Sequence, residues 1–415
     1  MRPTDWSSAF APFQLRSFRF QWSADLLTSW AFEMETLILN WYVMVQTGSV
    51  MLLTSFASLQ FLGTLAAPMF GVLGDRLGGR VILCVMRTIY AALAGILALL
   101  GLAGALTPAA VFVVAAVAGI VRPNDLVMRH ALIGDTVPRT HLTGALGLSR
   151  ATMDSARVAG ALAGGSLFAA LGFGRAYLVV VSFYLAGVAL TFRVSRERLI
   201  SEPGAAPRTL VTSLPRPSNR RDLMEGLRYV WSSPRVLASM WLAFLVNLSA
   251  YPLSGGLLAY VVKDVYRANA GGLGSLVAGF SFGALVGSIT TVVTRRPRRP
   301  ERSMIIGILM WYVLLLWFAQ VRSMTVAIPV LVLVGFIQSI AMIAMSVSLL
   351  HASDRFRARV MGVRTLAVYG LPLGLLASGA LIERIGFSAT ATIYGLTGLA
   401  CTVVIAARWR ASVWH

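Results

Sequence analysis

Twelve apolar segments, each about twenty residues long, are separated by short connections that carry most of the charged residues. The 415 residues are 57% hydrophobic and 13% charged, and their mean hydropathy is +0.75. A soluble domain could not bury that much apolar surface, so we expect an all-α polytopic membrane protein with twelve transmembrane helices. The predicted spans are 22–45, 50–73, 81–104, 108–131, 143–170, 174–193, 236–262, 271–294, 303–321, 324–350, 360–382 and 388–408.

The segments fall into two halves. Residues 194–222 are rich in Arg, Pro and Ser and lack apolar periodicity, which is typical of a linker. Apolar residues then recur at helical spacing beside arginines, as in an amphipathic helix on a membrane surface. We therefore expect a six-helix bundle over 1–193, a cytoplasmic linker with an amphipathic helix over 194–235, and a second six-helix bundle over 236–415.

The second half weakly repeats the first at an offset of 214 residues. This offset predicts two pseudo-symmetric bundles related by an axis along the membrane normal. The matching pairs are Arg150 with Arg364, Gly160 with Gly374, Gly165 with Gly379, and Gly172-Phe173 with Gly386-Phe387.

The distribution of arginine predicts the orientation. Arginines cluster in alternate connections, including the long 194–235 segment and the run from Arg295 to Arg302, whereas the other connections carry few. Cytoplasmic loops carry such an excess of positive charge, so both termini are expected in the cytoplasm. The net charge of +20 is thereby assigned to the surface of an anionic bilayer and not to nucleic acid. The expected location is the bacterial cytoplasmic (inner) membrane.

The first predicted helix carries a polar stripe. Five polar residues recur at spacings of four, four, three and four, which places them within about 80° of arc on one helix face. Ionisable residues at the bilayer centre cost roughly 2.5–3.5 kcal/mol, so a functional role is the first hypothesis for each. Glu33 is the leading candidate for proton coupling, and Asp25 and Asn40 are candidates for a substrate cavity. Glu35 lies on another face, where structural pairing is favoured over proton coupling. The stripe consists of Asp25, Ser29, Glu33, Thr36 and Asn40.

Two trios of charged residues occupy single faces of the fourth and fifth predicted helices, each with an acid between two bases. One interpretation is a cavity with surplus positive charge that attracts an anionic or polar substrate through Arg122 and Arg157, with Asp154 available for proton exchange. The other is a structural brace in which the charges neutralise one another. The trios are Arg122, Asp125 and Arg129, and Arg150, Asp154 and Arg157.

Further cavity candidates lie in the second half. Asn247 and Tyr251 share a face of the seventh predicted helix, and Pro252 is expected to break that helix where a gate could bend. Gln338 and Tyr369 are the candidates in the tenth and eleventh helices.

The connection between the second and third predicted helices reads Gly71-Val72-Leu73-Gly74-Asp75-Arg76-Leu77-Gly78-Gly79-Arg80. It resembles the loop signature of the major facilitator superfamily, with Gly79 at a position that is usually basic. An ion-pair lock at a cytoplasmic gate is expected here, completed by an acid beyond the fourth helix. The gate candidates are Gly71, Asp75, Arg76, Gly78, Arg80 and Asp135.

A second resemblance concerns the fifth helix, where four glycines follow the superfamily's antiporter signature: Gly147, Gly160, Gly164 and Gly165. Ala156 stands where the signature has a glycine, and Ala161 stands where it has a proline. Local strings such as Ser17-Phe18-Arg19 and Leu132 to Pro138 resemble the branch of macrolide-efflux proteins and the enterobactin exporter. This branch implies secondary active, proton-coupled export of amphipathic small molecules (drugs, macrolides or siderophores) by alternating access.

Several classes are disfavoured. No Walker-type phosphate loop, nucleophile triad or metal-ligand spacing of the four histidines occurs in the sequence, so we expect no enzyme, cofactor or metal. The expected partners are a small-molecule substrate, protons and the lipid bilayer, and we expect a monomer. Three alternatives stay open: an importer of a small polar solute, a lysophospholipid transporter, and a non-transporting membrane receptor or scaffold.

Overall fold

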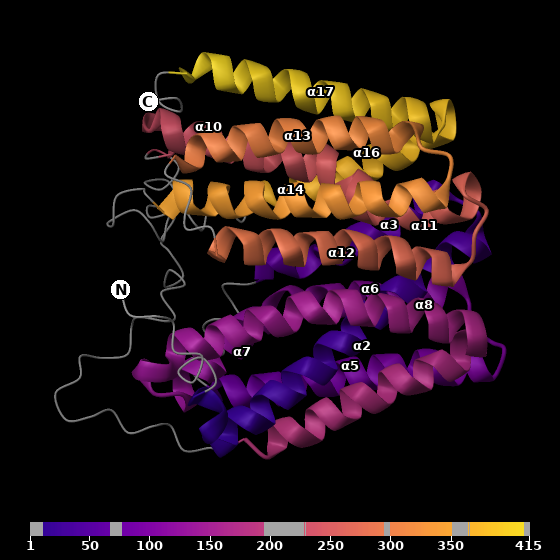
Figure 1. Cartoon of the computed structure of the whole chain (residues 1–415). Coiled ribbons are helices and arrows are strands. Elements are labelled where there is room, and N and C mark those ends of the chain that lie inside the picture. Colours follow the sequence, from indigo (N-terminus) through magenta and orange to yellow (C-terminus); the bar gives the residue numbers. More distant parts are fainter. Residues whose placement is uncertain are drawn as a thin grey trace. The chain divides into compact units, whose positions relative to one another are not determined.

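The computed structural model describes residues 11–66, 77–194, 228, 230–293, 299–350, 364 and 366–410, and all regular secondary structure within these ranges is helical (Figure 1). Eight helices in the described part are long and apolar enough to cross a membrane. Each of the twelve predicted spans overlaps a described helix. The helical membrane fold expected from the sequence is therefore confirmed, and the helix order is consistent with twelve spans.

Contacts group the chain into two compact units. Unit 1 comprises residues 1–38 and 60–217, and unit 2 comprises residues 39–59 and 218–415. Residues 39–59 thus group with the C-terminal part, unlike in the predicted bundles. The predicted linker at 194–235 falls mostly outside the described residues, so that boundary stays a prediction.

Unit 1 is built around α2 (Arg16–Thr47), whose last residues belong to unit 2, and around α5 (Gly79–Leu102), which packs against α7 and α8. Helix α2 begins six residues before the predicted span because Phe18 packs with Ile133, Val137 and Ala145 in a buried cluster. The other elements are η1 (Ala11–Gln14), η2 (Leu62–Ala66), α6 (Pro108–Val121), η3 (Arg122–Asn124), α7 (Asp125–Thr136) and α8 (Arg139–Phe192).

The fourth predicted span is interrupted in its middle. Helix α6 ends at Val121 and α7 begins at Asp125, with the 3-10 turn η3 between them. Pro123 lies in this turn and lacks the amide hydrogen that a regular α-helix would use there. The turn begins with Arg122 and ends directly before Asp125, and both residues belong to the first charged trio.

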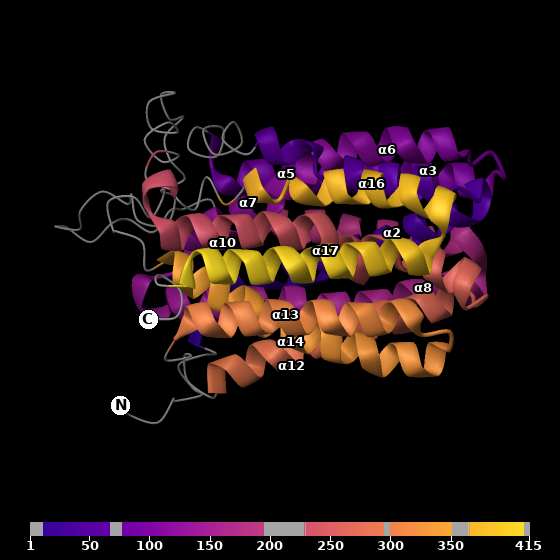
Figure 2. The same cartoon turned by 90° about the horizontal axis from the view of Figure 1, so that it is seen from above.

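In unit 2, helices α12, α14, α13 and α17 lie side by side in that order, as both views show (Figures 1 and 2). Helix α3 packs against α16, where a Cβ atom on Gly379 would lie 3.3 Å from Met51 Cα. The bounds are α3 (Val50–Leu59), α10 (Pro234–Leu245), α11 (Leu258–Tyr260), α12 (Ala270–Val293), α13 (Pro300–Gln320), α14 (Met324–Leu350), α16 (Gly370–Ile385) and α17 (Phe387–Arg408).

The seventh span, Pro234–Val265, was expected to break at Pro252 but instead stays helical and widens. Three π-helical segments occupy Val246–Ala250, Pro252–Gly256 and Val261–Val265. A π-turn accommodates the missing proline amide hydrogen without ending the helix.

The internal repeat is visible in the backbone. Gly172 interrupts α8 with φ 74° and ψ −180°, and Gly386 separates α16 from α17 with φ 78° and ψ 170°. Positive φ at these values favours glycine. Packing repeats as well, since a Cβ atom on Gly160 would lie 2.8 Å from Glu33 Cβ, beside Met34, and one on Gly374 would clash with the carbonyl of Leu248, 214 positions after Met34.

Candidate functional site

Unit 1 contains a cavity of about 220 Å³. Its wall is formed by α2, α5, the η3–α7 segment and α8, and it combines apolar side chains such as Phe32, Leu126 and Met153 with ionisable ones. Charged or hydroxyl-bearing side chains on the wall include Glu33, Tyr90, Arg122, Asp125, Arg129 and Arg157. The predicted proton-coupling residue Glu33 and the predicted cavity residues Arg122 and Arg157 therefore lie around one cavity.

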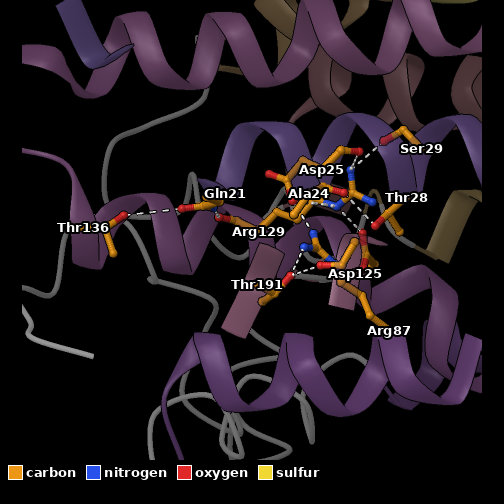
Figure 3. Close-up of polar contacts among 11 residues, drawn as sticks. Gln21, Ala24, Asp25, Thr28, Ser29, Arg87, Asp125, Arg129, Thr136 and Thr191 are labelled. Carbon is orange, nitrogen blue, oxygen red and sulfur yellow. Dashed lines mark hydrogen bonds and ion pairs between the residues drawn. The ribbon is translucent and has the colours of Figure 1, made fainter. Parts of the chain in front are cut away.

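A buried ion pair lies beside this cavity. Asp25 of α2 pairs with Arg87 of α5, and the Arg87 side chain is fully buried (Figure 3). Arg87 also donates a hydrogen bond to Thr191 Oγ1. Asp25 was expected to line a cavity. It is 3% exposed and is not among the residues that form the cavity wall described above. Sequence reasoning overlooked Arg87, although a single arginine inside the apolar run 81–104 was a usable signal.

Arg129 of α7 connects this pair to the cavity. It forms an ion pair with Asp125 one turn earlier, and its Nε lies 3.7 Å from Asp25 Oδ1. Its Nη1 donates to the Asp25 carbonyl at 3.2 Å and to Ser29 Oγ at 2.7 Å (Figure 3). Gln21 Nε2 donates to the Arg129 carbonyl at 3.0 Å. Two acids and two bases thus form one buried network that fixes α2, α5 and α7 together.

Glu35 is held in a second buried pair. Its side chain is 2% exposed, forms an ion pair with Arg122, and accepts hydrogen bonds from Tyr177 at 3.2 Å and Tyr184 at 2.7 Å. The guanidinium carbon of Arg122 lies 4.5 Å from the centre of the Phe32 ring. With three donors fixed on one carboxylate, the geometry favours the structural interpretation of Glu35.

A third group is more accessible. Arg157 Nε lies 3.6 Å from Glu33 Oε1, and its Nη1 lies 3.7 Å from Asp154 Oδ1. Arg150 Nε donates to Asp154 Oδ2 at 3.1 Å. The side chain of Arg157 is 45% exposed and that of Glu33 is 21% exposed. Glu33, Asp154 and Arg157, named separately from the sequence, are therefore neighbours.

These groups are balanced in charge, which differs from the surplus of positive charge expected from the two trios. The trios alone contain four bases and two acids, whereas α2 supplies three further carboxylates and α5 one further guanidinium. Each guanidinium thus has a carboxylate within ion-pair distance. The arginines are Arg87, Arg122, Arg129, Arg150 and Arg157, and the acids are Asp25, Glu33, Glu35, Asp125 and Asp154.

The predicted cytoplasmic gate is described in part, because Gly71, Asp75 and Arg76 lie outside the described residues. Gly78 has φ 84° immediately before α5, which agrees with a tight turn. Arg80 donates to the carbonyls of Thr191 and Phe192 at the end of α8, where a cation is favourable. Asp135 lies in the last turn of α7. The lock itself stays a prediction.

Unit 2 brings together two of its predicted cavity residues. Gln338 Nε2 donates to Tyr251 Oη at 2.8 Å, and the Tyr251 ring packs edge-on against Trp311. Asn247 Nδ2 instead donates to the Ala243 carbonyl of its own helix at 2.8 Å. Tyr369 precedes α16, and Asn40 is half-buried on α2. Their roles as cavity residues stay predictions.

Long apolar helices, an internal repeat and a cavity lined by both apolar and ionisable side chains define the class, a multi-pass membrane protein. The chain belongs to the Major Facilitator Superfamily, whose family model matches residues 22–372. No curated protein matches the sequence.

Solved structures share the fold. The nucleoside transporter NupG is 14% identical with a TM-score of 0.71, covering 96% of this chain and 99% of that one. A bacterial homolog of the human lysosomal transporter Spinster is 16% identical with a TM-score of 0.65, and 95% of each chain is covered. The human organic anion transporter MFSD10 is 17% identical with a TM-score of 0.63, covering 94% of this chain and 99% of that one. At these identities the likeness concerns the fold alone.

Proposed function

We propose that the protein exports amphipathic small molecules in exchange for protons across the bacterial cytoplasmic membrane by alternating access, with both termini in the cytoplasm. The observation that carries the proposal is the position of Glu33. Among the five carboxylates of unit 1 whose ion pairs are described above, Glu33 has the longest ion-pair distance, 3.6 Å, and the most exposed side chain. A proton and a substrate can therefore both reach it within the cavity.

Protonation of Glu33 would upset the balance between the five arginines and the five acids described above. Neutral Glu33 no longer compensates Arg157, whose remaining carboxylate, Asp154, is shared with Arg150. An uncompensated guanidinium in a partly desolvated site is costly, so the protonated and deprotonated states should favour different helix arrangements. Such a difference between two states is what couples proton binding to alternating access. The apolar wall formed by Phe32, Leu126 and Met153 supports an amphipathic substrate.

The test uses inside-acidic proteoliposomes with a pH-sensitive fluorophore and a panel of amphipathic drugs that includes a macrolide. Drug added outside should release protons from the vesicles in the wild type, and Glu33→Gln should abolish this release. Glu383→Gln is the matched control, because Glu383 binds Ser49 and Met51 in unit 2 and its replacement keeps an acceptor oxygen. Unchanged proton release in Glu33→Gln would remove Glu33 from the mechanism. Proton uptake together with the added compound would indicate an importer.

A further inference from the structure

Three residues of the cavity wall each carry a polar atom that is buried and has neither a hydrogen bond nor an ion-pair contact within the described part of the chain: the Tyr90 hydroxyl oxygen, Asp125 Oδ1 and Arg122 Nε. Arg129 Nε, a fourth wall atom without a hydrogen bond, is in an ion pair with Asp125. Tyr90 as a whole is 4% exposed. A buried polar group without a partner costs about 1–3 kcal/mol, so such groups are rare unless a ligand satisfies them. Three of them on one cavity wall therefore indicate a recognition subsite.

The subsite is held rigidly by its neighbours. The Tyr90 ring packs against the Tyr184 ring with centroids 5.8 Å apart, and the Arg122 guanidinium carbon lies 5.9 Å from the Tyr90 centroid. Arg122 is fixed by Glu35, and Asp125 is fixed by Arg129. These constraints orient the free atoms before any ligand binds, which reduces the entropic cost of binding.

The three atoms differ in what they require. Asp125 Oδ1 accepts a hydrogen bond, Arg122 Nε donates one, and the Tyr90 hydroxyl can do either. The formal charges of Asp125 and Arg122 are already matched by Arg129 and Glu35. An anionic ligand group would meet the free carboxylate oxygen, and a cationic group would meet the free guanidinium nitrogen. A neutral group that both donates and accepts avoids both conflicts.

From this geometry we infer that Tyr90, Asp125 and Arg122 recognise a neutral, hydroxyl-bearing head group of the substrate, while Phe32 and its apolar neighbours contact the apolar body. A sugar ring or another polyhydroxyl group attached to an aromatic or aliphatic body has this chemistry. The inference deepens the proposed function, because it rests on this cavity being the substrate site. It does not depend on which carboxylate takes the proton.

Calorimetric titration of the full chain in lipid nanodiscs, without a proton gradient, tests the inference. Three probes share a phenyl ring and differ in head group: phenyl β-D-glucoside, benzoate and benzyltrimethylammonium. The glucoside should have the lowest Kd. Tyr90→Phe, which removes one hydroxyl and keeps the ring, should raise the Kd of the glucoside about tenfold. Tyr394→Phe is the matched control, because the Tyr394 hydroxyl donates to the Gly374 carbonyl in unit 2. The Kd of this variant for the glucoside should equal that of the wild type.

A measurement on the ligand side needs no variant. Phenyl tetrahydropyranyl ether keeps both rings but lacks the hydroxyls, and it should bind the wild type at least tenfold more weakly than the glucoside. Any one of three results would overturn the inference: tighter binding of benzoate or benzyltrimethylammonium, no measurable binding of the glucoside, or an unchanged glucoside Kd in Tyr90→Phe. Glu33→Gln should still bind the glucoside, so failure of proton coupling and failure of this subsite are separate results.

Discussion

Replacing Arg87 by Met should strongly destabilise unit 1. The Arg87 side chain is 0% exposed and forms an ion pair with Asp25, whose side chain is 4% exposed. Removing one member of a buried pair costs about 3–5 kcal/mol, because the other charge stays buried without compensation. In Arg87→Met the carboxylate of Asp25 keeps a second guanidinium, that of Arg129, at 3.7 Å. We therefore expect the low end of the range, about 3 kcal/mol.

The reverse change should cost more. Asp25→Asn leaves Arg87 fully buried with neutral acceptors as its described partners, the new amide oxygen and the Thr191 hydroxyl. We therefore expect a loss of about 5 kcal/mol. The double variant that combines Arg87→Met with Asp25→Asn removes both charges and leaves Arg129 paired with Asp125. Because replacing a whole buried pair by groups of similar volume is often nearly neutral, the double variant should be more stable than Asp25→Asn alone.

The assay is equilibrium unfolding in mixed micelles with increasing dodecyl sulfate, followed by helical circular dichroism. Arg150→Met is the control, because the Arg150 side chain is 62% exposed and its pair with Asp154 should contribute at most about 1 kcal/mol. Equal losses in Arg87→Met and Arg150→Met would refute the reasoning. Strict additivity in the double variant would refute it as well.

Three further predictions concern stability in the same assay. Gly374→Ala should cost about 1–3 kcal/mol, because the new Cβ atom would meet a backbone carbonyl, whereas Gly147→Ala should be tolerated, since nothing lies within 4 Å of its Cβ position. Gly386→Ala should cost about 1–2 kcal/mol, since φ is 78° there, and equal stability would contradict the assigned backbone. Tyr184→Phe removes a 2.7 Å hydrogen bond to the Glu35 carboxylate and should cost about 1.5–3 kcal/mol, and a loss below that range would indicate that another donor replaces it.

The fold could be predicted from the sequence because a bilayer fixes the length of an apolar helix. Details that depend on tertiary packing could not. The extension of α2 to Arg16 depends on Phe18 meeting residues more than a hundred positions away. The widening at Pro252 depends on neighbouring backbone groups that periodicity does not reveal.

The candidate site shows the same limit. Asp125 with Arg129 and Arg150 with Asp154 could be predicted, because residues four apart on a helix are neighbours. The pairs between helices could not, since helical spacing says nothing about which face meets which. Of the two interpretations of the trios, a surplus of positive charge overlooked these pairs between helices: Glu35 pairs with Arg122 across the helix interface.

Comparison of the two repeats shows which features occur in both halves of the chain and which occur in unit 1. At an offset of 214 residues, Gly160 and Gly374 both allow close helix packing. The charges of the Glu33–Arg157 pair do not repeat, since Glu33 corresponds to Asn247 and Arg157 corresponds to Leu371. The Asn247 amide bonds within its own helix and cannot take up a proton at physiological pH. Close packing is therefore common to both halves, whereas the titratable pair belongs to one. In the proposed mechanism, a proton entering at Glu33 would change the electrostatic energy of unit 1 with no matching change at the equivalent positions of unit 2. This asymmetry would allow proton binding to bias one half against the other.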